Sequence, residues 1–202
     1  MRTKGNEKAE SWDKIYREGK PGWDIAKPAP PFVDLVKQNP DWLTPGTLIS
    51  FGCGGGHDAN YFSQEGYTVT ALDFSSEAIK LAKNNYPDLK LIQKNILELS
   101  SEQDGFYDYV LEHTCFCAIP REQRRDYMES AHRILKENGQ IFGLFYRFDP
   151  PDQDGPPYSL SMEELEQAFD GLFTLEENFI PKRSHGRRTQ RELFIRLKKI
   201  ND

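Results

Sequence analysis

The stretch TLISFGCGGGHDANYFSQEGYTVTALD, residues 47–73, determines the fold. Its first five residues form an apolar run that is typical of a buried strand. The glycines of GCGGG (52–56) end that strand, and HDANYFSQE (57–65) has the spacing of a helix. YTVTALD (67–73) is rich in β-branched residues and predicts a second strand. A strand, a glycine turn, a helix and another strand make a βαβ unit, in which the two strands lie parallel.

The alternation of strands and helices continues along the chain. We expect three further helices over 76–86, 121–136 and 161–169. Further strands are expected over 89–93, 107–112, 140–148, 173–179 and 191–199. Because only a polar loop joins the last two strands, they favour an antiparallel hairpin at one edge of the sheet. The pattern predicts an α/β sandwich with a mainly parallel sheet.

The residues before the first strand form a separate part of this plan. We expect a helix over 6–18 and a short helix over 32–38, with the proline-rich KPAPPF (27–32) between them. The whole chain, 1–202, is predicted to be one domain, with residues 1–45 as an N-terminal lid or appendage.

Composition excludes several classes of protein. The chain has 202 residues and a net charge of −6, and its mean hydropathy is −0.72. No apolar run approaches the roughly 18 to 20 residues that cross a bilayer, and the N-terminus lacks the apolar stretch of a signal peptide. We therefore expect a cytoplasmic protein without a membrane partner, acting as a monomer, although the sequence does not exclude an oligomer. The three cysteines, Cys53, Cys115 and Cys117, predict neither a disulfide framework nor a metal site.

The charge is unevenly distributed. Residues 1–181 hold 18 basic and 30 acidic side chains, whereas residues 182–202 hold 8 basic and 2 acidic ones. A nucleic-acid-binding protein usually shows a basic balance or a dense basic face, so we expect no nucleic-acid partner. Two interpretations of the basic segment stay open, a solvated hairpin and a contact for an anionic partner near the site.

The glycine loop indicates the kind of ligand. Gly52, Gly54 and Gly56 have the spacing GxGxG, whereas the dinucleotide fingerprint GxGxxG would require a glycine in place of His57. This weakens the alternative of a nicotinamide-dependent oxidoreductase and favours a nucleoside cofactor without a pyrophosphate. Asp73, at the end of the second strand, can accept hydrogen bonds from both hydroxyls of a ribose.

Asn95 and Ile96 follow the third strand and form a second candidate contact. The amide of Asn95 could accept a hydrogen bond from an adenine amino group, and Ile96 could pack on the ring. An asparagine at this place could equally serve a turn.

Together these residues resemble the S-adenosylmethionine-dependent methyltransferases of the thiopurine S-methyltransferase family, which includes thiol and halide methyltransferases. The motifs that carry the resemblance are WDKIYREGKPGWDIAKPAP (12–30), GCGGGHDA (52–59), ALDFS (71–75), YDYVLEHTCFCAIP (107–120) and GPPYS (155–159). The resemblance implies a Rossmann-like class I methyltransferase sandwich, whose seven-stranded sheet is mostly parallel with an antiparallel edge strand. With the glycine loop, it implies cofactor contacts from Trp12, Tyr16, Trp23, Gly52, Gly54, Gly56, Asp73, Asn95, Ile96 and His113.

The implied reaction moves a methyl group by in-line displacement and leaves S-adenosylhomocysteine. The protein has mainly to align the reactants and exclude water. Aromatic rings can stabilise the sulfonium charge, and the candidates are Trp12, Trp23, Phe116 and Tyr146, each of which could equally be a core residue. No metal is needed.

The acceptor is predicted to be a small molecule, either a sulfur nucleophile (a thiol or thiopurine) or a halide. A thiol must lose its proton to react. His113 could accept that proton or position the acceptor, and a structural role for the ring is the alternative. The candidate acceptor contacts are Phe116, Cys117, Tyr146, Arg147 and Tyr158, of which Tyr158 could instead belong to a rigid surface loop. A non-catalytic cofactor-binding module is the remaining alternative.

Overall fold

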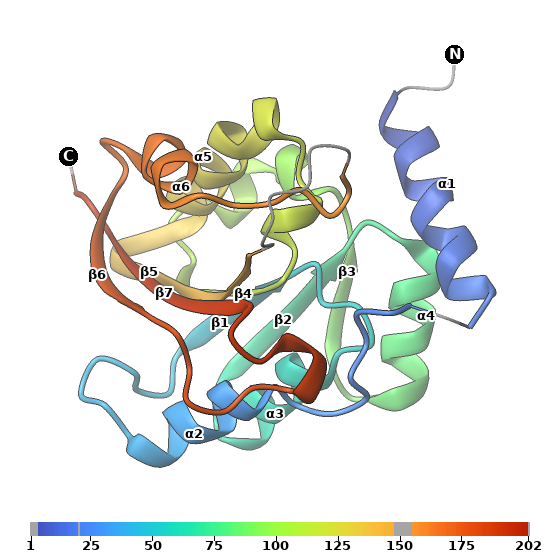
Figure 1. Ribbon diagram of the computed structural model, residues 1–202, viewed down its shortest axis with the longest axis horizontal. Helices are drawn as coiled ribbons and strands as arrows, with labels where there is room; N and C mark the ends of the chain where they lie inside the picture. The colour runs from blue at the N-terminus through green and yellow to red at the C-terminus, as the bar shows by residue number, and fades with distance from the viewer. Residues whose placement is uncertain (1–3, 20, 148–154, 202) are drawn as a thin grey trace.

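The computed structural model describes residues 4–19, 21–147 and 155–201, and its seven strands form one sheet (Figure 1). The strands are β1 (Thr47–Phe51), β2 (Thr68–Asp73), β3 (Lys90–Gln93), β4 (Tyr107–His113), β5 (Leu135–Tyr146), β6 (Phe173–Phe179) and β7 (Glu192–Lys199). Their order across the sheet is β3-β2-β1-β4-β5-β7-β6. The order turns back at β1, between β2 and β4, and ligands of such sheets bind beyond the carboxyl ends of the strands at this point.

The predicted sheet, mostly parallel with an antiparallel hairpin, is confirmed. Strands β1 to β5 pair in parallel, and β7 runs antiparallel to both β5 and β6. The hairpin does not simply add to the edge, because β7 lies between β5 and β6. Glu192, the first residue of β7, is therefore the register partner of Tyr146, the last residue of β5. The loop that leads into β7 thus reaches the carboxyl ends of the parallel strands.

Helices cover both faces of the sheet. They are α1 (Lys4–Arg17), α2 (Pro30–Gln38), α3 (His57–Gln64), α4 (Ser76–Asn85), α5 (Arg124–Ile134) and α6 (Met162–Phe169). Helices α2 and α3 lie on one face and α5 and α6 on the other, while α1 stands beside α4 (Figure 1). None of the helices in the described ranges is long and apolar enough to span a membrane.

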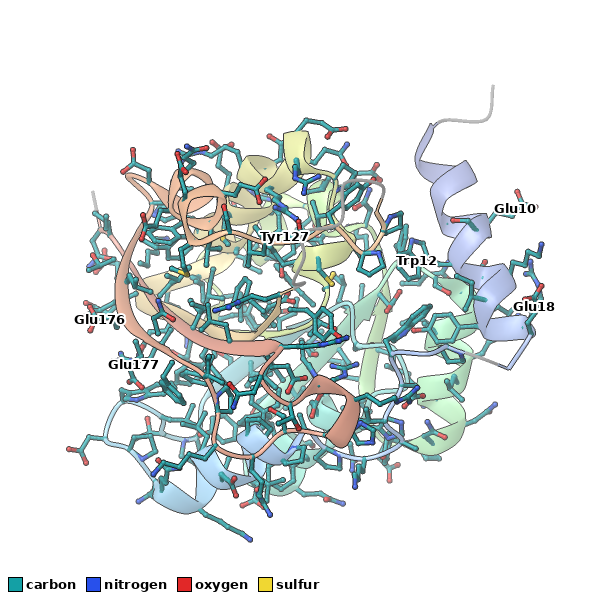
Figure 2. The ribbon with its side chains drawn as sticks, viewed as in Figure 1. Glu10, Trp12, Glu18, Tyr127, Glu176 and Glu177 are labelled. Carbon is teal, nitrogen blue, oxygen red and sulfur yellow. The ribbon has the colours of Figure 1, made fainter. Side chains whose placement is uncertain are left out.

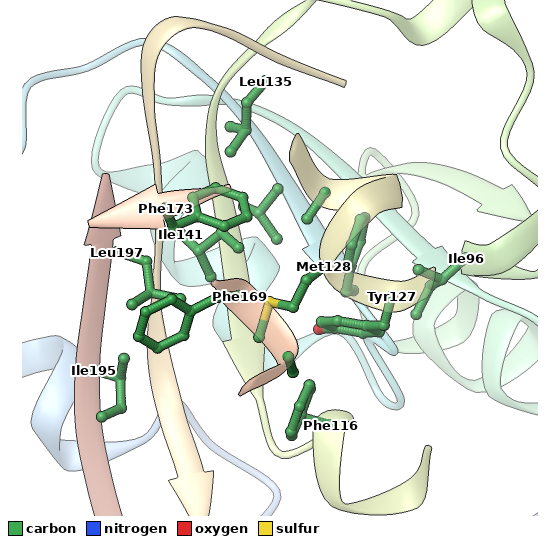
Figure 3. Close-up of a cluster of buried hydrophobic side chains, with 14 of the residues drawn as sticks. Ile96, Phe116, Tyr127, Met128, Leu135, Ile141, Phe169, Phe173, Ile195 and Leu197 are labelled. Atoms are coloured by element: carbon green, nitrogen blue, oxygen red, sulfur yellow. The ribbon is translucent and has the colours of Figure 1, made fainter. Parts of the chain in front are cut away.

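The buried side chains divide between the two faces as the two-residue period of a strand requires. Leu48 and Leu111 pack with α2 and α3, whereas their neighbours Ile49 and Val110 pack with α5 and α6. Figure 3 shows the second of these clusters, in which Tyr127 and Met128 of α5 meet residues of β5 and β7. The two clusters pack helices against both faces of the sheet and so stabilise the strands whose ends form the site.

Several element boundaries differ from the sequence-based prediction, and two of the differences have a clear physical reason. The helix expected over 121–136 is α5 over 124–134 only, because Leu135 already enters β5 as the partner of Tyr107. Helix α2 begins at Pro30 rather than at residue 32, since a proline in the first turn of a helix has no N–H to lose.

Close approach of β4 and β5 depends on Gly143. A Cβ atom at this position would lie 2.1 Å from the carbonyl oxygen of Glu112. Glycine therefore allows the two strands to carry the last residues of β4 into the site.

Candidate cofactor and acceptor site

A cavity of about 560 Å³ lies beyond the carboxyl ends of the central strands. It is bordered by α1 and the loop after it, and on the other side by the loop before β7. Ten of the residues predicted for the site line it, namely Trp12, Tyr16, Trp23, Gly52, Asp73, Asn95, Ile96, His113, Cys117 and Tyr146. Sequence motifs far apart in the chain thus meet in one space.

Gly52 and Asp73 form the part of the cavity next to β1 and β2. Gly52 has a φ of +57°, and a Cβ there would lie 2.7 Å from the sulfur of Cys115, so only glycine fits. The carboxylate of Asp73 accepts backbone hydrogen bonds from Gly54 and Ser75, each at 3.0 Å. Burial nevertheless raises the pKa of Asp73 to about 6. A buried carboxylate with a further lone pair on each oxygen fits the hydroxyls of a ribose.

The other two glycines of the motif shape the loop. Gly54 faces a second, smaller space of about 50 Å³ beside the main cavity. Gly56, with a φ of +80°, precedes α3, and a Cβ there would lie 3.2 Å from Ala82 of α4. Its role in the structure is close packing of α3 and α4.

Aromatic side chains cover the same end of the cavity. The ring of Trp23 contacts Trp12 and Tyr16 edge-on, at centroid distances of 5.0 and 5.7 Å. The indole N–H of Trp23 also donates to the hydroxyl of Tyr16 at 3.2 Å. Figure 2 shows Trp12 on the side of α1 that faces the rest of the molecule, whereas Glu10 and Glu18 point away. Burial raises the pKa of Tyr16, so this aromatic cover is uncharged.

Ile96 and Asn95 lie after β3 and have different surroundings. Ile96 is buried and gives the cavity an apolar surface. The amide oxygen of Asn95 accepts from the backbone N–H of Leu97 at 3.1 Å, and so caps the short 3₁₀ helix Ile96–Glu98. Asn95 thus serves the turn through its amide oxygen and lines the cavity at the same time.

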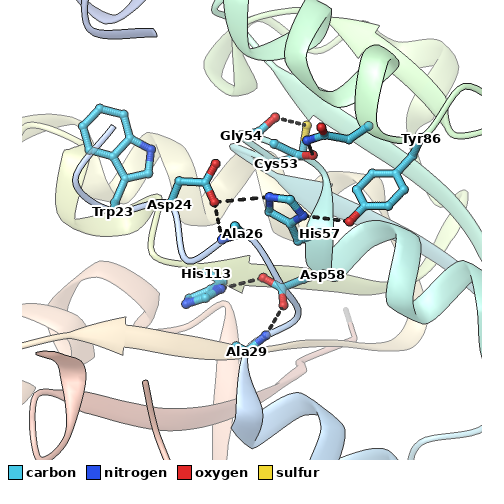
Figure 4. Close-up of polar contacts among 12 residues, drawn as sticks. Trp23, Asp24, Ala26, Ala29, Cys53, Gly54, His57, Asp58, Tyr86 and His113 are labelled. Atoms are coloured by element: carbon cyan, nitrogen blue, oxygen red, sulfur yellow. Dashed lines mark hydrogen bonds and ion pairs between the residues drawn. The ribbon is translucent and has the colours of Figure 1, made fainter. Parts of the chain in front are cut away.

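His113, at the end of β4, is the centre of a polar network. Its Nδ1 lies 2.6 Å from a carboxylate oxygen of Asp58, and its Nε2 lies 2.7 Å from Nη1 of Arg188 (Figure 4 shows the Asp58 side). The same Nη1 lies 3.1 Å from Glu192. A guanidinium has donors only, so Nε2 accepts from Arg188 and Nδ1 donates to Asp58.

The charge of His113 depends on which neighbour dominates. Burial lowers its pKa, but the carboxylates of Asp58 and Glu192 raise it to about 9, against the opposing charge of Arg188. A charged ring would donate from Nε2 to Glu192, which is 3.4 Å away, whereas Arg188 is at 2.7 Å. Because the 2.7 Å contact with Arg188 requires an Nε2 without a proton, the geometry favours the neutral ring with its proton on Nδ1, against the direction in which the two carboxylates shift the pKa.

Sequence reasoning named none of the residues that form the basic wall of the cavity. His185, Arg187, Arg188 and Arg191 all line it, from the loop before β7. The basic run was visible in the sequence, but its position required the placement of β7 between β5 and β6. Of the two interpretations of this segment, the one near the site agrees with its position. Asp58 was also missed as a site residue, although it lies within the quoted motif GCGGGHDA (52–59).

Three predicted acceptor contacts do not line the cavity. Phe116 is 1% exposed and packs in the core against Tyr127 and Phe145. Arg147 is exposed, and its backbone N–H donates to the carbonyl of Arg191. Tyr158 has its ring beneath the guanidinium of Arg121, and its N–H donates to Cys117 at 2.7 Å. Tyr158 thus anchors the loop at 155–158 beside the cavity.

The cysteines near the site are free thiols. Burial raises the pKa of Cys117 to about 12 and that of Cys115 well above its ordinary value. Since only the thiolate is nucleophilic, these side chains act as neutral wall residues.

The sheet, the glycine loop and the aspartate at the end of β2 define a class I S-adenosylmethionine-dependent methyltransferase. Residues 7–185 match the model of the thiopurine S-methyltransferase (TPMT) family, and the chain belongs to that family. It is therefore an S-adenosylmethionine-dependent methyltransferase, which excludes the nicotinamide-dependent alternative.

Named relatives and solved structures are similar over most of their length. Thiocyanate methyltransferase 1 of Brassica oleracea is 28% identical over 200 residues, covering 94% of this chain and 85% of the relative. Thiopurine S-methyltransferase of Acinetobacter baylyi is 25% identical and covers 79% and 82%. The 1,6-didemethyltoxoflavin-N1-methyltransferase of Burkholderia thailandensis, solved with S-adenosylhomocysteine, superposes with a TM-score of 0.74 at 20% identity, covering 96% and 87%.

Proposed function

We propose that this methyltransferase transfers the methyl group of S-adenosylmethionine to a small sulfur nucleophile, a thiol or thiopurine, or to a halide. The observation that carries the proposal is a single cavity with two chemically different ends. Gly52, Asp73 and Ile96 form one end, and the basic wall before β7 forms the other. Relatives named for thiocyanate and for thiopurines support this acceptor class.

The cofactor end is suited to a nucleoside. Asp73 would accept hydrogen bonds from the ribose, and Ile96 would pack on the adenine. When bound, the cofactor supplies a methyl group that is already activated by a positively charged sulfur. Trp12 and Trp23 would cover it, exclude water and attract the sulfonium through their ring faces. We propose that the segment up to residue 45, which carries these rings, is a lid.

The acceptor end is suited to an electron-rich nucleophile. Arg187 and Arg191, which line this end, would hold a negative charge near the transferred methyl group. A thiol with a pKa of about 8.5 is ionised to a few per cent at neutral pH, and positive charge increases that fraction. Both ring nitrogens of His113 already have partners, so we propose that His113 positions the acceptor rather than accepting its proton. A halide needs no base at all.

Calorimetry and a turnover screen test the proposal. S-adenosylmethionine and S-adenosylhomocysteine should both bind. Asp73→Asn should weaken the binding of each by about tenfold or more, the scale of a lost charge-assisted hydrogen bond. Asp88→Asn, an exposed carboxylate in the turn before β3, is the matched control. Methyl products should form with thiols, thiopurines, bisulfide or iodide. Binding without turnover of any acceptor would instead favour a non-catalytic module.

A further inference from the structure

Arg188 is a buried cation that contacts three separate parts of the chain. It is 7% exposed and lies in the short 3₁₀ helix Gly186–Arg188 before β7. Its Nη1 donates to Nε2 of His113 at 2.7 Å and to Glu192 at 3.1 Å. Its Nη2 donates to the backbone carbonyl of Trp23. Arg188 thus joins the cofactor cover to the acceptor wall.

The loop that carries Trp23 is tied to the body at a few points only. Asp58 accepts from the N–H of Ala29 at 2.7 Å through one oxygen and binds His113 through the other. Asp24 lies 3.2 Å from His57. Figure 4 shows these contacts, with Asp58 between Ala29 and His113. Two of the ties from the loop, through Arg188 and through Asp58, therefore end on the two nitrogens of the same imidazole.

We propose that Arg188 is a positioning residue that links the seating of the loop at 21–29 over the cofactor to the orientation of His113 at the acceptor end. The inference rests on the proposed assignment of the two ends of the cavity. With the loop seated, the Trp23 carbonyl holds one arm of the planar guanidinium, which aims the other arm at His113. When the loop is displaced, Nη2 loses the Trp23 carbonyl and only Nη1 keeps its partners, Glu192 and His113. The plane of the guanidinium is then no longer fixed.

A simple ion pair would not need this arrangement. Glu192 alone, four residues along the chain, neutralises the charge of Arg188. The contacts beyond that pair both go to residues that line the cavity, His113 and Trp23. A lysine has no planar fork with which to make both contacts at once. Holding the Trp23 loop and His113 at the same time therefore requires an arginine at this position, whereas an ion pair with Glu192 does not.

The test compares Arg188→Met and Arg188→Lys with Arg183→Met. Arg183 lies in the same loop and pairs with Asp34 of α2, but it does not line the cavity. Calorimetry with S-adenosylhomocysteine measures the cofactor end, and kcat/KM with iodide and with 2-mercaptoethanol measures the acceptor end. Circular dichroism and thermal unfolding establish that each variant is folded, and Arg188→Lys, which can keep the Glu192 pair, carries the test if Arg188→Met does not fold.

We expect Arg188→Met to weaken the binding of S-adenosylhomocysteine by about tenfold or more. It should lower kcat/KM by the same factor for iodide and for the thiol, because a positioning role does not depend on whether the acceptor has a proton to lose. Arg188→Lys should recover only part of each loss, and Arg183→Met should stay within about twofold of the wild type, as surface pairs do.

Two results would overturn the inference. One is an Arg188→Met variant that binds S-adenosylhomocysteine like the wild type. The other is a loss confined to the thiol, which would assign Arg188 to proton removal. Failure of the wild type to bind S-adenosylhomocysteine would overturn the proposed function as well, whereas wild-type binding with an unaffected Arg188→Met would overturn this inference alone.

Discussion

The carboxylate of Asp13 in α1 accepts a hydrogen bond from the hydroxyl of Ser75 at 2.5 Å, and Ser75 is the residue that caps α4. Asp13 also accepts from Ser76 at 3.1 Å and from the N–H of Glu77 at 3.2 Å. Burial raises the pKa of Asp13, but these hydrogen bonds outweigh it and hold the pKa below its ordinary value. Because Ser75 also donates its N–H to Asp73, α1 is anchored next to the candidate ribose contact.

Asp13→Ala should therefore weaken the binding of S-adenosylhomocysteine without touching the ligand. The substitution releases α1, which carries Trp12 and Tyr16, and we expect a loss of about 1 to 2 kcal/mol, the scale of a few hydrogen bonds to a charge. Calorimetry measures it. Glu18→Gln, an exposed acid directly after the same helix, is the control. Equal affinities for Asp13→Ala and the wild type would show that α1 is not a cover.

Cofactor affinity should fall as the pH is lowered through about 6. Asp73 has its pKa raised to about 6 by burial, so below that pH the carboxyl is protonated and neutral. Ribose hydroxyls donate best to the ionised form, so binding should weaken by up to about tenfold per pH unit below this value. Calorimetry with S-adenosylhomocysteine between pH 5 and pH 8 checks the slope. Asp73→Asn should bind weakly with no such slope, and a slope that persisted in this variant would assign the titration to another group.

Glu112→Gln should flatten the dependence of stability on pH. Glu112 is fully buried on β4, and burial raises its pKa to about 7, while Tyr127 and the N–H of Phe116 donate to it. The pKa of Glu112 in the folded protein lies above its ordinary value of 4.5. The protonated carboxyl therefore stabilises the fold fully below pH 4.5, and this stabilisation is lost as the pH rises through about 7.

The measurement is thermal unfolding of Glu112→Gln and of the wild type at pH 5 and pH 8. The Tm of the variant relative to that of the wild type should be higher at pH 8 than at pH 5. Glu129→Gln, an exposed acid on α5 that pairs with Arg125, is the control and should show no such change. The same difference in Tm at both values of pH would contradict the prediction.

Gly143→Ala should destabilise the fold by about 2 kcal/mol or more, the scale of overpacking in a core. The added Cβ would lie 2.1 Å from the carbonyl of Glu112, so β4 and β5 would have to separate. Urea unfolding measures the loss. Gly186→Ala, where a Cβ would meet no atom within 4 Å, should leave the stability nearly unchanged. A Gly143→Ala variant as stable as the wild type would mean that the strands adjust at no cost.

The sequence predicted the sheet, and most of the residues predicted to contact the cofactor line one cavity, for physical reasons. The strands β1, β2 and β4 are short and rich in apolar and β-branched residues, as buried parallel strands are. The glycine loop and Asp73 are local signals at fixed distances from them. The acceptor end is different. His113 and Arg188 meet only through the order of β5, β7 and β6, and no local pattern contains that order.

Phe116 illustrates the same limit from the other side. An aromatic residue between two cysteines after β4 has the composition of a pocket wall. In the structure the short 3₁₀ helix Phe116–Ala118 turns its ring into the core, while Cys115 and Cys117 face the cavity. Sequence spacing alone does not give the direction of a side chain in a turn of three residues.

The hydrogen bond from Arg188 to Trp23 joins residues 165 positions apart, so the cavity is closed by segments from opposite ends of the chain. During synthesis on the ribosome, the glycine loop, Asp73 and the aromatic cover emerge long before β7. A nascent chain that stops short of β7 carries the basic residues of the loop at 185–191 but lacks the strand that holds this loop against the end of β5. We therefore expect the site to be complete only when β7 has inserted between β5 and β6, and truncation before that strand to abolish methyl transfer even though most of the sheet is already made.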